Sequence, residues 1–238
     1  MSIEVNREVK RPSREVVEGF RSLLEEYYSI TPGVSDVMNR LNAMSSDIKP
    51  VFEGIRMVGI ALTVKTITSD LAPVIKALEL IQSGDIIVVD THNSKDTAFW
   101  GEIVCMEARR KGATGIILDS AVRDVVELRE FKFPVLCQGI APNVASLVGF
   151  GYVNVPIQCG GAAVNPGDIV IVDDNGVVVV PQDEAEDVLK KTRRFLENEL
   201  KVIDRVKAGE TLYQILGLDK LEEAVIDSTI VYEKQRQG

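Results

Sequence analysis

Two hydrophobic patterns alternate along the chain: short runs that are apolar at nearly every position, and longer stretches in which apolar residues recur every three or four positions. The short runs are rich in Val and Ile and predict buried strands. In the last of them, "PGDIVIVDDNGVVVVP", the polar "DDNG" separates two apolar halves and predicts a β-hairpin. The predicted strands lie at about 55–68, 83–90, 114–119, 134–139 and 166–181.

The helical pattern is clearest near the two ends of the chain. Residues 12–29 carry an apolar stripe with Pro12 near its start, and residues 183–208 form a long amphipathic stretch. The stretch "TPGVSDVMNRLNAM" predicts a turn and a second, short helix with Ser35 as its N-cap. Further helices are predicted at about 70–84, ended by Gly84, at 98–112, ended by Gly112, at 121–130, and, as one or two short helices, in the tail after 210.

No linker-like stretch divides the chain. Its 238 residues, 45% of them hydrophobic and 26% charged, are enough for one large domain with a substantial core. Strands that alternate with helices indicate the α/β class. We therefore expect one domain over 1–238, with a core at about 30–185 and a C-terminal helical extension at about 186–238. The tail of that extension is suited to packing on a neighbouring subunit.

Charge and cysteine content narrow the class of protein further. The formal net charge is −9, and no run rich in Lys or Arg appears, which argues against a nucleic-acid partner. No apolar run is long enough to span a membrane, and the first twenty residues have no apolar leader segment. The three cysteines, Cys105, Cys137 and Cys159, each lie among apolar residues. We expect buried free thiols and therefore a cytoplasmic protein.

A single histidine, His92, excludes sites that need several histidines from one chain. No G-x-S-x-G motif supplies a serine nucleophile, and the cysteine spacings match no zinc pattern. His92 is interpreted as a hydrogen-bonding loop residue, and Lys95 as an exposed lysine rather than a Schiff-base former. Gly160-Gly161 predicts a tight turn. Any catalysis by this chain is expected to use carboxylates, Arg or Lys, and a hard metal ion.

Charged residues gather where two of the predicted strands end. The helix predicted to start near Ala98 offers unpaired amides to an anion, and it carries Glu102 in its first turn. Arg123 and Asp124 follow the next strand, which ends at Asp119. If the strands are neighbours, Arg123 is placed to bind a carboxylate, and Asp124 and Glu102 to hold Mg²⁺. Two alternatives stay open: Arg123 and Asp124 form a surface ion pair, and Asp119 either orients Arg123 or only ends a strand.

Glu102 followed by twenty residues and then Arg123-Asp124 resembles the acidic-x20-Arg-Asp pattern of the 4-hydroxy-4-methyl-2-oxoglutarate aldolases and the related regulator of ribonuclease activity A (RraA) proteins. Some members carry the older label demethylmenaquinone methyltransferase. The resemblance covers about 30–185 and includes "GDIIVVD", "GATGIILDSAVRD", "PVLCQG" and "NPGDIVIVDDNGVVVVP". It implies a swivelling β/β/α-type sandwich that assembles as a homotrimer or homohexamer with sites between subunits.

The resemblance also implies an activity. It is that of a class II lyase that cleaves 4-hydroxy-4-methyl-2-oxoglutarate-type substrates to pyruvate and decarboxylates oxaloacetate, with Mg²⁺ or Mn²⁺ as cofactor. Asp124 is then a metal ligand, Glu102 acts through a water on the metal, and Arg123 binds the small 2-oxo acid and stabilises its enolate. Residues Ala98, Phe99, Trp100 and Gly101 are expected to bind a substrate carboxylate through their amides.

The resemblance leaves other functions open. Glu102 stands where the aldolase pattern has Asp, and Phe99 and Trp100 are bulky for this loop, so the natural substrate is not predicted. A carboxylate from the long helix of a partner chain, Glu197 or Glu199, is a candidate to complete the site. The alternative functions are an RraA-type inhibitor of an RNA-degrading enzyme, and a lyase or dehydratase that acts on a sugar-acid derivative.

Overall fold

The computed structural model describes residues 2–67, 69–218 and 220. The chain divides into two compact units, Met1–Arg193 and Arg194–Gly238. The first unit contains all the strands of the described residues, and the boundary falls inside the C-terminal helical extension predicted from the sequence. No helix of the described residues is long and apolar enough to cross a membrane.

Four parallel strands form the centre of the first unit. They are β3 (Met57–Thr66), β4 (Asp85–Asp90), β5 (Gly115–Leu118) and β7 (Val135–Cys137), and they neighbour one another in this order. Every residue of β4 and β5 is buried. This explains the apolar runs of the sequence, because a parallel strand covered on both faces needs apolar side chains at every position.

The long strand β3 joins two groups of strands along its other edge. Its first residues pair antiparallel with β12 (Ile169–Asp173), and its last residues pair antiparallel with β9 (Gly151–Val153). β12 forms the predicted hairpin with β13 (Gly176–Val180). Two short strands complete this sheet, β1 (Ile3–Val5) beside β9 and β2 (Lys49–Pro50) beside β7.

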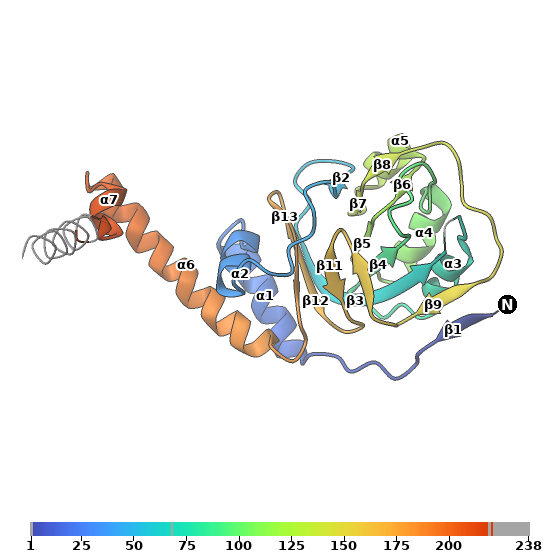
Figure 1. Ribbon diagram of the computed structural model, residues 1–238, viewed down its shortest axis with the longest axis horizontal. Helices are drawn as coiled ribbons and strands as arrows, with labels where there is room; N and C mark the ends of the chain where they lie inside the picture. The colour runs from blue at the N-terminus through green and yellow to red at the C-terminus, as the bar shows by residue number, and fades with distance from the viewer. Residues whose placement is uncertain (1, 68, 219, 221–238) are drawn as a thin grey trace, which may run out of the picture. The chain divides into compact units, whose positions relative to one another are not determined.

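The two faces of the central strands pack against different layers. Ile87 and Val89 of β4 belong to a core shared with the helices α3 (Ala72–Leu78), α4 (Glu102–Arg110) and α5 (Val125–Phe131). Ile86 and Val88 belong to a second core, shared with the β12–β13 hairpin and with a small hairpin of β10 (Ile157–Cys159) and β11 (Ala162–Val164). Figure 1 shows β4 between α4 on one side and β11 on the other. The layers confirm the predicted β/β/α-type α/β fold.

The helices lie where the sequence patterns predict them, but some of them begin or end at other residues than expected. Helix α1 (Arg14–Glu26) begins after Ser13, whose side chain accepts from the amide of Val16 at 3.3 Å. Helix α3 ends at Leu78 and does not reach Gly84 as expected. Helices α6 (Ala185–Lys207) and α7 (Leu212–Ile215) lie in the predicted extension. The tail beyond residue 220 lies outside the described residues.

Helix α2 (Thr31–Val37) corrects one prediction. Ser35 lies inside this helix and is not its N-cap. The cap comes from Asp173, the last residue of β12, whose carboxylate accepts from the amides of Ile30 and Thr31 at 2.8 Å each. Local sequence could not reveal this cap, because its donor and acceptor residues lie more than a hundred positions apart.

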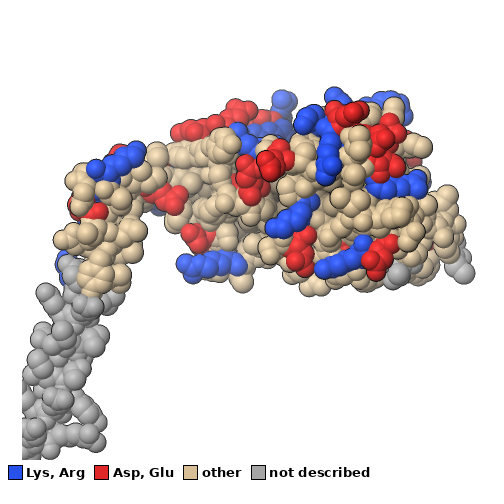
Figure 2. Space-filling model, turned by 90° about the horizontal axis from the view of Figure 1, so that it is seen from above, with Lys and Arg blue, Asp and Glu red and all other residues tan. Residues whose placement is uncertain are grey.

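The predictions on cysteines and surface charge are also testable against the structure. Cys105, Cys137 and Cys159 are free thiols and buried, as expected, and burial raises the pKa of Cys105 and of Cys137 to about 11. Thiols with so high a pKa are poor nucleophiles. On the face drawn in Figure 2, basic and acidic side chains are interspersed, and the basic ones form no continuous patch.

Candidate active site

The loop before α4 leads directly to the predicted site residues. Helix α4 begins at Glu102, four residues later than expected. The residues before it cannot be helical, because Ala98 forms bridges with Ala121 and with Val144. Ala121 belongs to the short strand β6 (Ala121–Val122), which pairs in parallel with β8 (Gly139–Ile140). These contacts place the segment 98–101 beside the segment that carries Arg123 and Asp124.

Asp124 lies at the start of two helices. It precedes α5 and has left-handed backbone angles, φ 54° and ψ 43°, which are uncommon for a residue other than glycine. Its Oδ2 accepts a hydrogen bond of 3.0 Å from the backbone amide of Glu102, the first residue of α4. The carboxylate therefore lies at the positive end of α4, where a negative charge is stabilised. No hydrogen bond from the described residues reaches its other oxygen, Oδ1.

Gly101 allows this contact because it has no side chain. A Cβ at this position would lie 2.4 Å from Asp124 Oδ2 and 3.2 Å from Arg123 Cγ, both closer than van der Waals contact allows. The φ of Gly101 is −160°, an extended angle that any residue adopts. The glycine is therefore required by the close approach of the two chain segments and not by its backbone angles.

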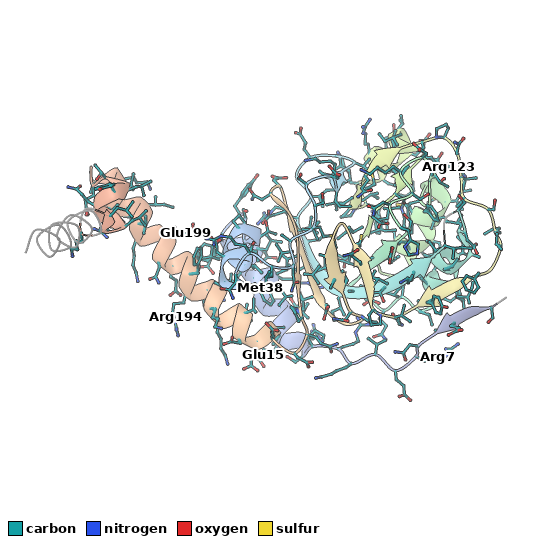
Figure 3. The ribbon with its side chains drawn as sticks, viewed as in Figure 1. Arg7, Glu15, Met38, Arg123, Arg194 and Glu199 are labelled. Carbon is teal, nitrogen blue, oxygen red and sulfur yellow. The ribbon has the colours of Figure 1, made fainter. Side chains whose placement is uncertain are left out.

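The backbone of Arg123 is held by a hydrogen bond, whereas its side chain is partly exposed. Its amide donates to the carbonyl of Trp100 at 2.9 Å, which joins the two site segments once more. Its Nε lies 3.7 Å from Asp124 Oδ2, and the side chain is 40% exposed. Figure 3 shows Arg123 next to α4 and α5. The ion pair with Asp124, proposed above as an alternative, is present, but it is long and leaves the terminal guanidinium nitrogens available to a ligand.

The four amides predicted to bind a carboxylate are not equivalent. The amide of Ala98 donates to the carbonyl of Asn143 at 2.7 Å, and that of Phe99 donates to the carbonyl of Ala121 at 3.1 Å. Both are used within the chain. The amides of Trp100 and Gly101 make no hydrogen bond with the described residues, so the anion-binding role predicted for 98–101 is narrowed to these two.

A small pocket opens beside these residues. Phe99, Trp100 and Gly101 line it together with Arg123 and Asp124, and Ile103 and Val104 contribute from the first turn of α4. Leu71 and Val144 complete its wall. The sequence offered no signal for either, because neither belongs to the segments 98–102 and 119–124 in which charged residues gather. The indole of Trp100 is 2% exposed and stacks on Phe133 at 6.4 Å, so it stiffens the floor of the pocket.

The residues present fit a hard divalent cation. Asp124 has one carboxylate oxygen without a hydrogen-bond partner among the described residues. No hydrogen bond or ion pair from the described residues reaches the carboxylate of Glu102, the first residue of α4. Mg²⁺ keeps several waters and is often held by one or two carboxylates. The described residues contain no group of three or more acidic, His or Cys side chains that would form a closed metal site. The donor set therefore suits a metal with open positions.

Other predicted residues lie outside this pocket. Asp119 does not orient Arg123: it is buried, and its carboxylate accepts from the amide and the hydroxyl of Thr91 at 2.7 and 2.8 Å. Burial raises the pKa of Asp119. His92 lies with its Nδ1 3.6 Å from Asp90, and Lys95 pairs with Asp47 at 3.3 Å, both in an exposed loop.

Gly160 and Gly161 form the two-residue turn between β10 and β11, with φ of 54° and 81°. The prediction of a tight turn there is confirmed, since positive φ at both central residues is the rule for such hairpins. Glu197 and Glu199 belong to α6 in the second unit and are exposed (Figure 3 labels Glu199). Their part in a site stays a prediction.

Comparisons with known proteins point to one family. The sequence profile of the RraA-like family, described as Aldolase/RraA, matches residues 31–179. The chain is 35% identical over 164 residues to a protein of Halalkalibacterium halodurans whose naming as a 4-hydroxy-4-methyl-2-oxoglutarate aldolase is provisional. The match covers 69% of this chain and 78% of that protein.

Solved structures extend the match to the fold. RraAS2 of Streptomyces coelicolor, described as an unusual member of the RNase ES inhibitor RraA protein family, matches with a TM-score of 0.69 and 28% identity, over 83% of this chain and 100% of that chain. The RNA-processing inhibitor RraA of Thermus thermophilus matches with a TM-score of 0.60 and 31% identity, over 64% and 93%.

Fold and site together define an α/β protein of β/β/α type with an arginine and a carboxylate at a helix start. The chain belongs to the RraA-like family, which contains both aldolases and RraA proteins and whose members are generally oligomeric. Aldolases of this kind generally depend on a divalent metal.

Proposed function

We propose that this chain is a carbon–carbon lyase: a divalent-metal-dependent class II aldolase that cleaves 4-hydroxy-4-methyl-2-oxoglutarate-type substrates to pyruvate and also decarboxylates oxaloacetate. The observation that carries the proposal is the arrangement at the start of α4. There, Asp124 accepts from the amide of Glu102 at 3.0 Å with one oxygen to spare, and Arg123 lies beside it. A purely structural cap has no need of the exposed guanidinium or of the second carboxylate.

Asp124 holds Mg²⁺ or Mn²⁺ directly in this proposal, and Glu102 does so through water. When bound, the metal stabilises the negative charge that develops on the 2-oxo oxygen of the substrate. Arg123 binds the carboxylate next to that oxygen with two parallel hydrogen bonds and adds positive charge at the same place. The amides of Trp100 and Gly101 hold a second carboxylate at the far end of the substrate.

Both reactions then proceed through one intermediate, the enolate of pyruvate. In decarboxylation the bond between C3 and C4 of oxaloacetate breaks, its electron pair stays on C3 as the enolate, and CO₂ leaves. In aldol cleavage the C4 hydroxyl loses its proton to Glu102 through a water. C4 becomes the carbonyl carbon of a first pyruvate as the bond between C3 and C4 breaks, and the electron pair of that bond forms the same enolate. Protonation at C3 gives pyruvate in each case. Arg123 serves both reactions because the charge develops at the same oxygen.

A partner chain completes the site in this proposal, within a homotrimer or homohexamer. The second unit exposes Leu200, Ile203 and Val206 along α6, an apolar strip that suits a helix packed on a neighbouring subunit. Glu197 and Glu199 are two positions apart on α6 and therefore point to different sides of the helix. Only one of them is expected to reach a given site. Three free thiols fit a reducing, cytoplasmic location.

A lactate dehydrogenase-coupled pyruvate assay tests the activity. Oxaloacetate and 4-hydroxy-4-methyl-2-oxoglutarate are each supplied with Mg²⁺ or with a chelator, to the wild type, to Arg123→Gln and to Arg40→Gln. Arg40 is a matched control, because its side chain is 83% exposed and, among the described residues, forms an ion pair with Asp36 alone, outside the candidate site. We expect metal-dependent pyruvate release by the wild type and Arg40→Gln, and a loss in Arg123→Gln. Release no faster than with the metal alone contradicts the proposal.

The two RraA structures favour a second candidate, an inhibitor that docks on an RNA-degrading enzyme. The Arg123→Gln variant separates the two functions. An inhibitor acts through its outer surface, so it has no need of a guanidinium in a small pocket. Inhibition of RNase ES, the enzyme named for the Streptomyces relative, by wild type and Arg123→Gln alike, without pyruvate release by either, favours the inhibitor. A wild type that releases pyruvate without inhibiting favours the lyase.

A further inference from the structure

A second, larger cavity lies at the opposite edge of the sheet. It has a volume of about 500 Å³ and surrounds the amino ends of the parallel strands β3, β4 and β5, whereas the candidate active site follows their carboxyl ends. Helix α1 forms one wall. The residues that line the cavity are Arg21, Leu24, Glu25, Arg56, Met57, Val58, Ser83, Gly84, Gly112 and Thr114.

Arg56 is the unusual residue of this cavity. Its Nε and Nη2 are both buried and have no hydrogen-bond partner among the described residues. Its guanidinium carbon lies 4.9 Å from the centre of the Tyr28 ring, a cation–π contact that compensates only part of the lost hydration. No ion pair with a described residue neutralises its charge. Burying two donors of a charged group without partners is costly, and native proteins seldom do so without a reason.

The two free donors have a specific geometry. In a guanidinium group, the N–H of Nε and one N–H of Nη2 lie parallel on the same edge. This edge is the one that binds both oxygens of a carboxylate. In Arg21 the same edge is occupied, because its Nε and Nη2 both donate to the carbonyl of Val58 at 3.2 Å. Arg56 is therefore the arginine of the cavity whose carboxylate-binding edge has no hydrogen-bond partner among the described residues.

The charge around the cavity is suited to an anion. Arg21 and Arg56 contribute two positive charges, and Glu25 is the only acidic side chain in its lining. The Nη1 of Arg21 pairs with Glu18 at 2.8 Å, but neither arginine forms an ion pair with Glu25 among the described residues. Hydroxyl groups from Ser83 and Thr114 add donors, and Leu24 and Met57 add apolar surface.

We propose that this cavity binds a small organic carboxylate, with its carboxylate on the Nε–Nη2 edge of Arg56 and its apolar part against Leu24 and Met57. The volume lies in the range of small-molecule sites. Arg56 must rotate about its own side-chain bonds to present this edge. Tyr28, which covers the guanidinium face and is 68% exposed, moves aside without disturbing the core. The site is separate from the lyase site and does not depend on the proposed function.

Isothermal titration calorimetry of the full chain at low ionic strength tests this proposal. The probes are sodium benzoate and sodium succinate, with neutral benzamide as the matched control. The variants are Arg56→Gln, the exposed control Arg40→Gln, and Arg123→Gln in the candidate active site. We expect the wild type to bind benzoate, succinate or both, and not benzamide. Loss of one bidentate pair in Arg56→Gln weakens binding about tenfold or more, whereas Arg40→Gln binds as the wild type does. Arg123→Gln loses at most the binding at the candidate active site and keeps the binding that depends on Arg56.

Each other result overturns the proposal. No carboxylate binding by the wild type shows that the cavity is not a carboxylate site. Binding that is unchanged in Arg56→Gln, or lost in Arg123→Gln alone, places the ligand elsewhere. Light scattering on the same samples tests whether an acidic side chain of a partner subunit fills the cavity instead. In that case the wild type binds no carboxylate, and Arg56→Gln has a lower oligomer mass than the wild type. Because the readout is binding, failure here leaves the lyase proposal intact.

Discussion

The first turns of helices α2 and α4 both have backbone amides that need a hydrogen-bond acceptor, and the acceptor differs between the two helices in one respect. Neither helix is capped by a side chain of its own N-cap residue. Each is capped by an aspartate from elsewhere in the chain: Asp173 at the end of β12 serves α2, and Asp124 serves α4. Asp173 is 4% exposed, whereas the side chain of Asp124 is 37% exposed.

The difference lies in how many donors each carboxylate accepts. Asp173 accepts from Ser29 Oγ, from the amides of Ile30 and Thr31, from Thr31 Oγ1, and from both nitrogens of Asn175. A carboxylate offers about four acceptor sites, so Asp173 is saturated. Asp124 accepts from one amide. A saturated carboxylate supports the fold, whereas one that is held in place with an oxygen to spare is ready to bind a ligand.

The largest expected effect comes from Asp124→Asn. Asn keeps a carbonyl oxygen for the amide of Glu102, so we expect the free energy of unfolding to change by less than about 1 kcal/mol. The charge that binds the metal is lost, and we expect pyruvate release to fall by about a thousandfold. The coupled pyruvate assay, together with Mn²⁺ titration followed by electron paramagnetic resonance, measures both consequences. Asp47→Asn, on an exposed loop, is the control.

Asp173→Ala is expected to have the opposite effect to Asp124→Asn, because it lowers the stability of the fold and not the binding of the metal. Loss of this carboxylate leaves the buried amides of Ile30 and Thr31 without a partner, and we expect the free energy of unfolding to fall by about 3 kcal/mol. Urea denaturation at fixed protein concentration measures it. The neighbouring Asp174→Ala serves as control, because Asp174 is exposed and accepts one hydrogen bond of 3.2 Å from Gly54. If the two variants are equally stable, the number of hydrogen bonds that a carboxylate accepts does not distinguish a structural aspartate from a ligand-binding one.

Gly101→Ala tests whether the position of Asp124, and not only its charge, matters. The new Cβ would lie 2.4 Å from the present position of Asp124 Oδ2, so this oxygen would have to move. We expect about a hundredfold loss of kcat, since a displacement of this order at a catalytic group has that effect, with little loss of stability. Gly139→Ala is the matched control, because its Cβ meets the carbonyl of Lys95 at 3.3 Å and no site residue. Full activity in Gly101→Ala speaks against a role for the close contact.

The comparison also shows what the sequence could and could not predict. Strand positions were predictable, because strands such as β4 are buried on both faces and need apolar residues throughout. That Glu102 and Asp124 lie close together was predictable as well, since both follow neighbouring parallel strands. Their chemical roles stay predictions.

Contacts between distant residues were not predictable. Nothing near Ser35 shows that Asp173 would cap its helix, because the capping contact joins residues 142 positions apart. In the same way, the sequence predicts the start of a helix near Ala98, at the beginning of a helical stretch that is closed by Gly112. The bridges from Ala98 to Ala121 and Val144 override that local preference. Hydrogen bonds within the chain also use two of the four amides that the sequence assigned to a ligand, those of Ala98 and Phe99.

The smallest expected effect is a pH dependence that belongs to Asp173. Burial by itself raises the pKa of this carboxyl, but the hydrogen bonds from Thr31, Asn175 and Ile30 outweigh it and hold the pKa below its ordinary value. A carboxyl with a lowered folded-state pKa stabilises the fold above its unfolded-state pKa, and that contribution is lost as the pH falls through the folded-state value.

We therefore expect the stability difference between wild type and Asp173→Ala to be constant near neutral pH and to shrink below about pH 4, by about 1.4 kcal/mol for each unit by which the pKa is lowered. Urea denaturation at a series of pH values measures the difference. For Asp174→Ala the difference from the wild type should show no such acid-dependent loss. A difference for Asp173→Ala that stays constant into acid means that the hydrogen bonds hold the neutral carboxyl as well as the carboxylate. The stabilising effect of Asp173 would then not depend on its negative charge, and the contrast between Asp173 and Asp124 would lie in metal binding alone.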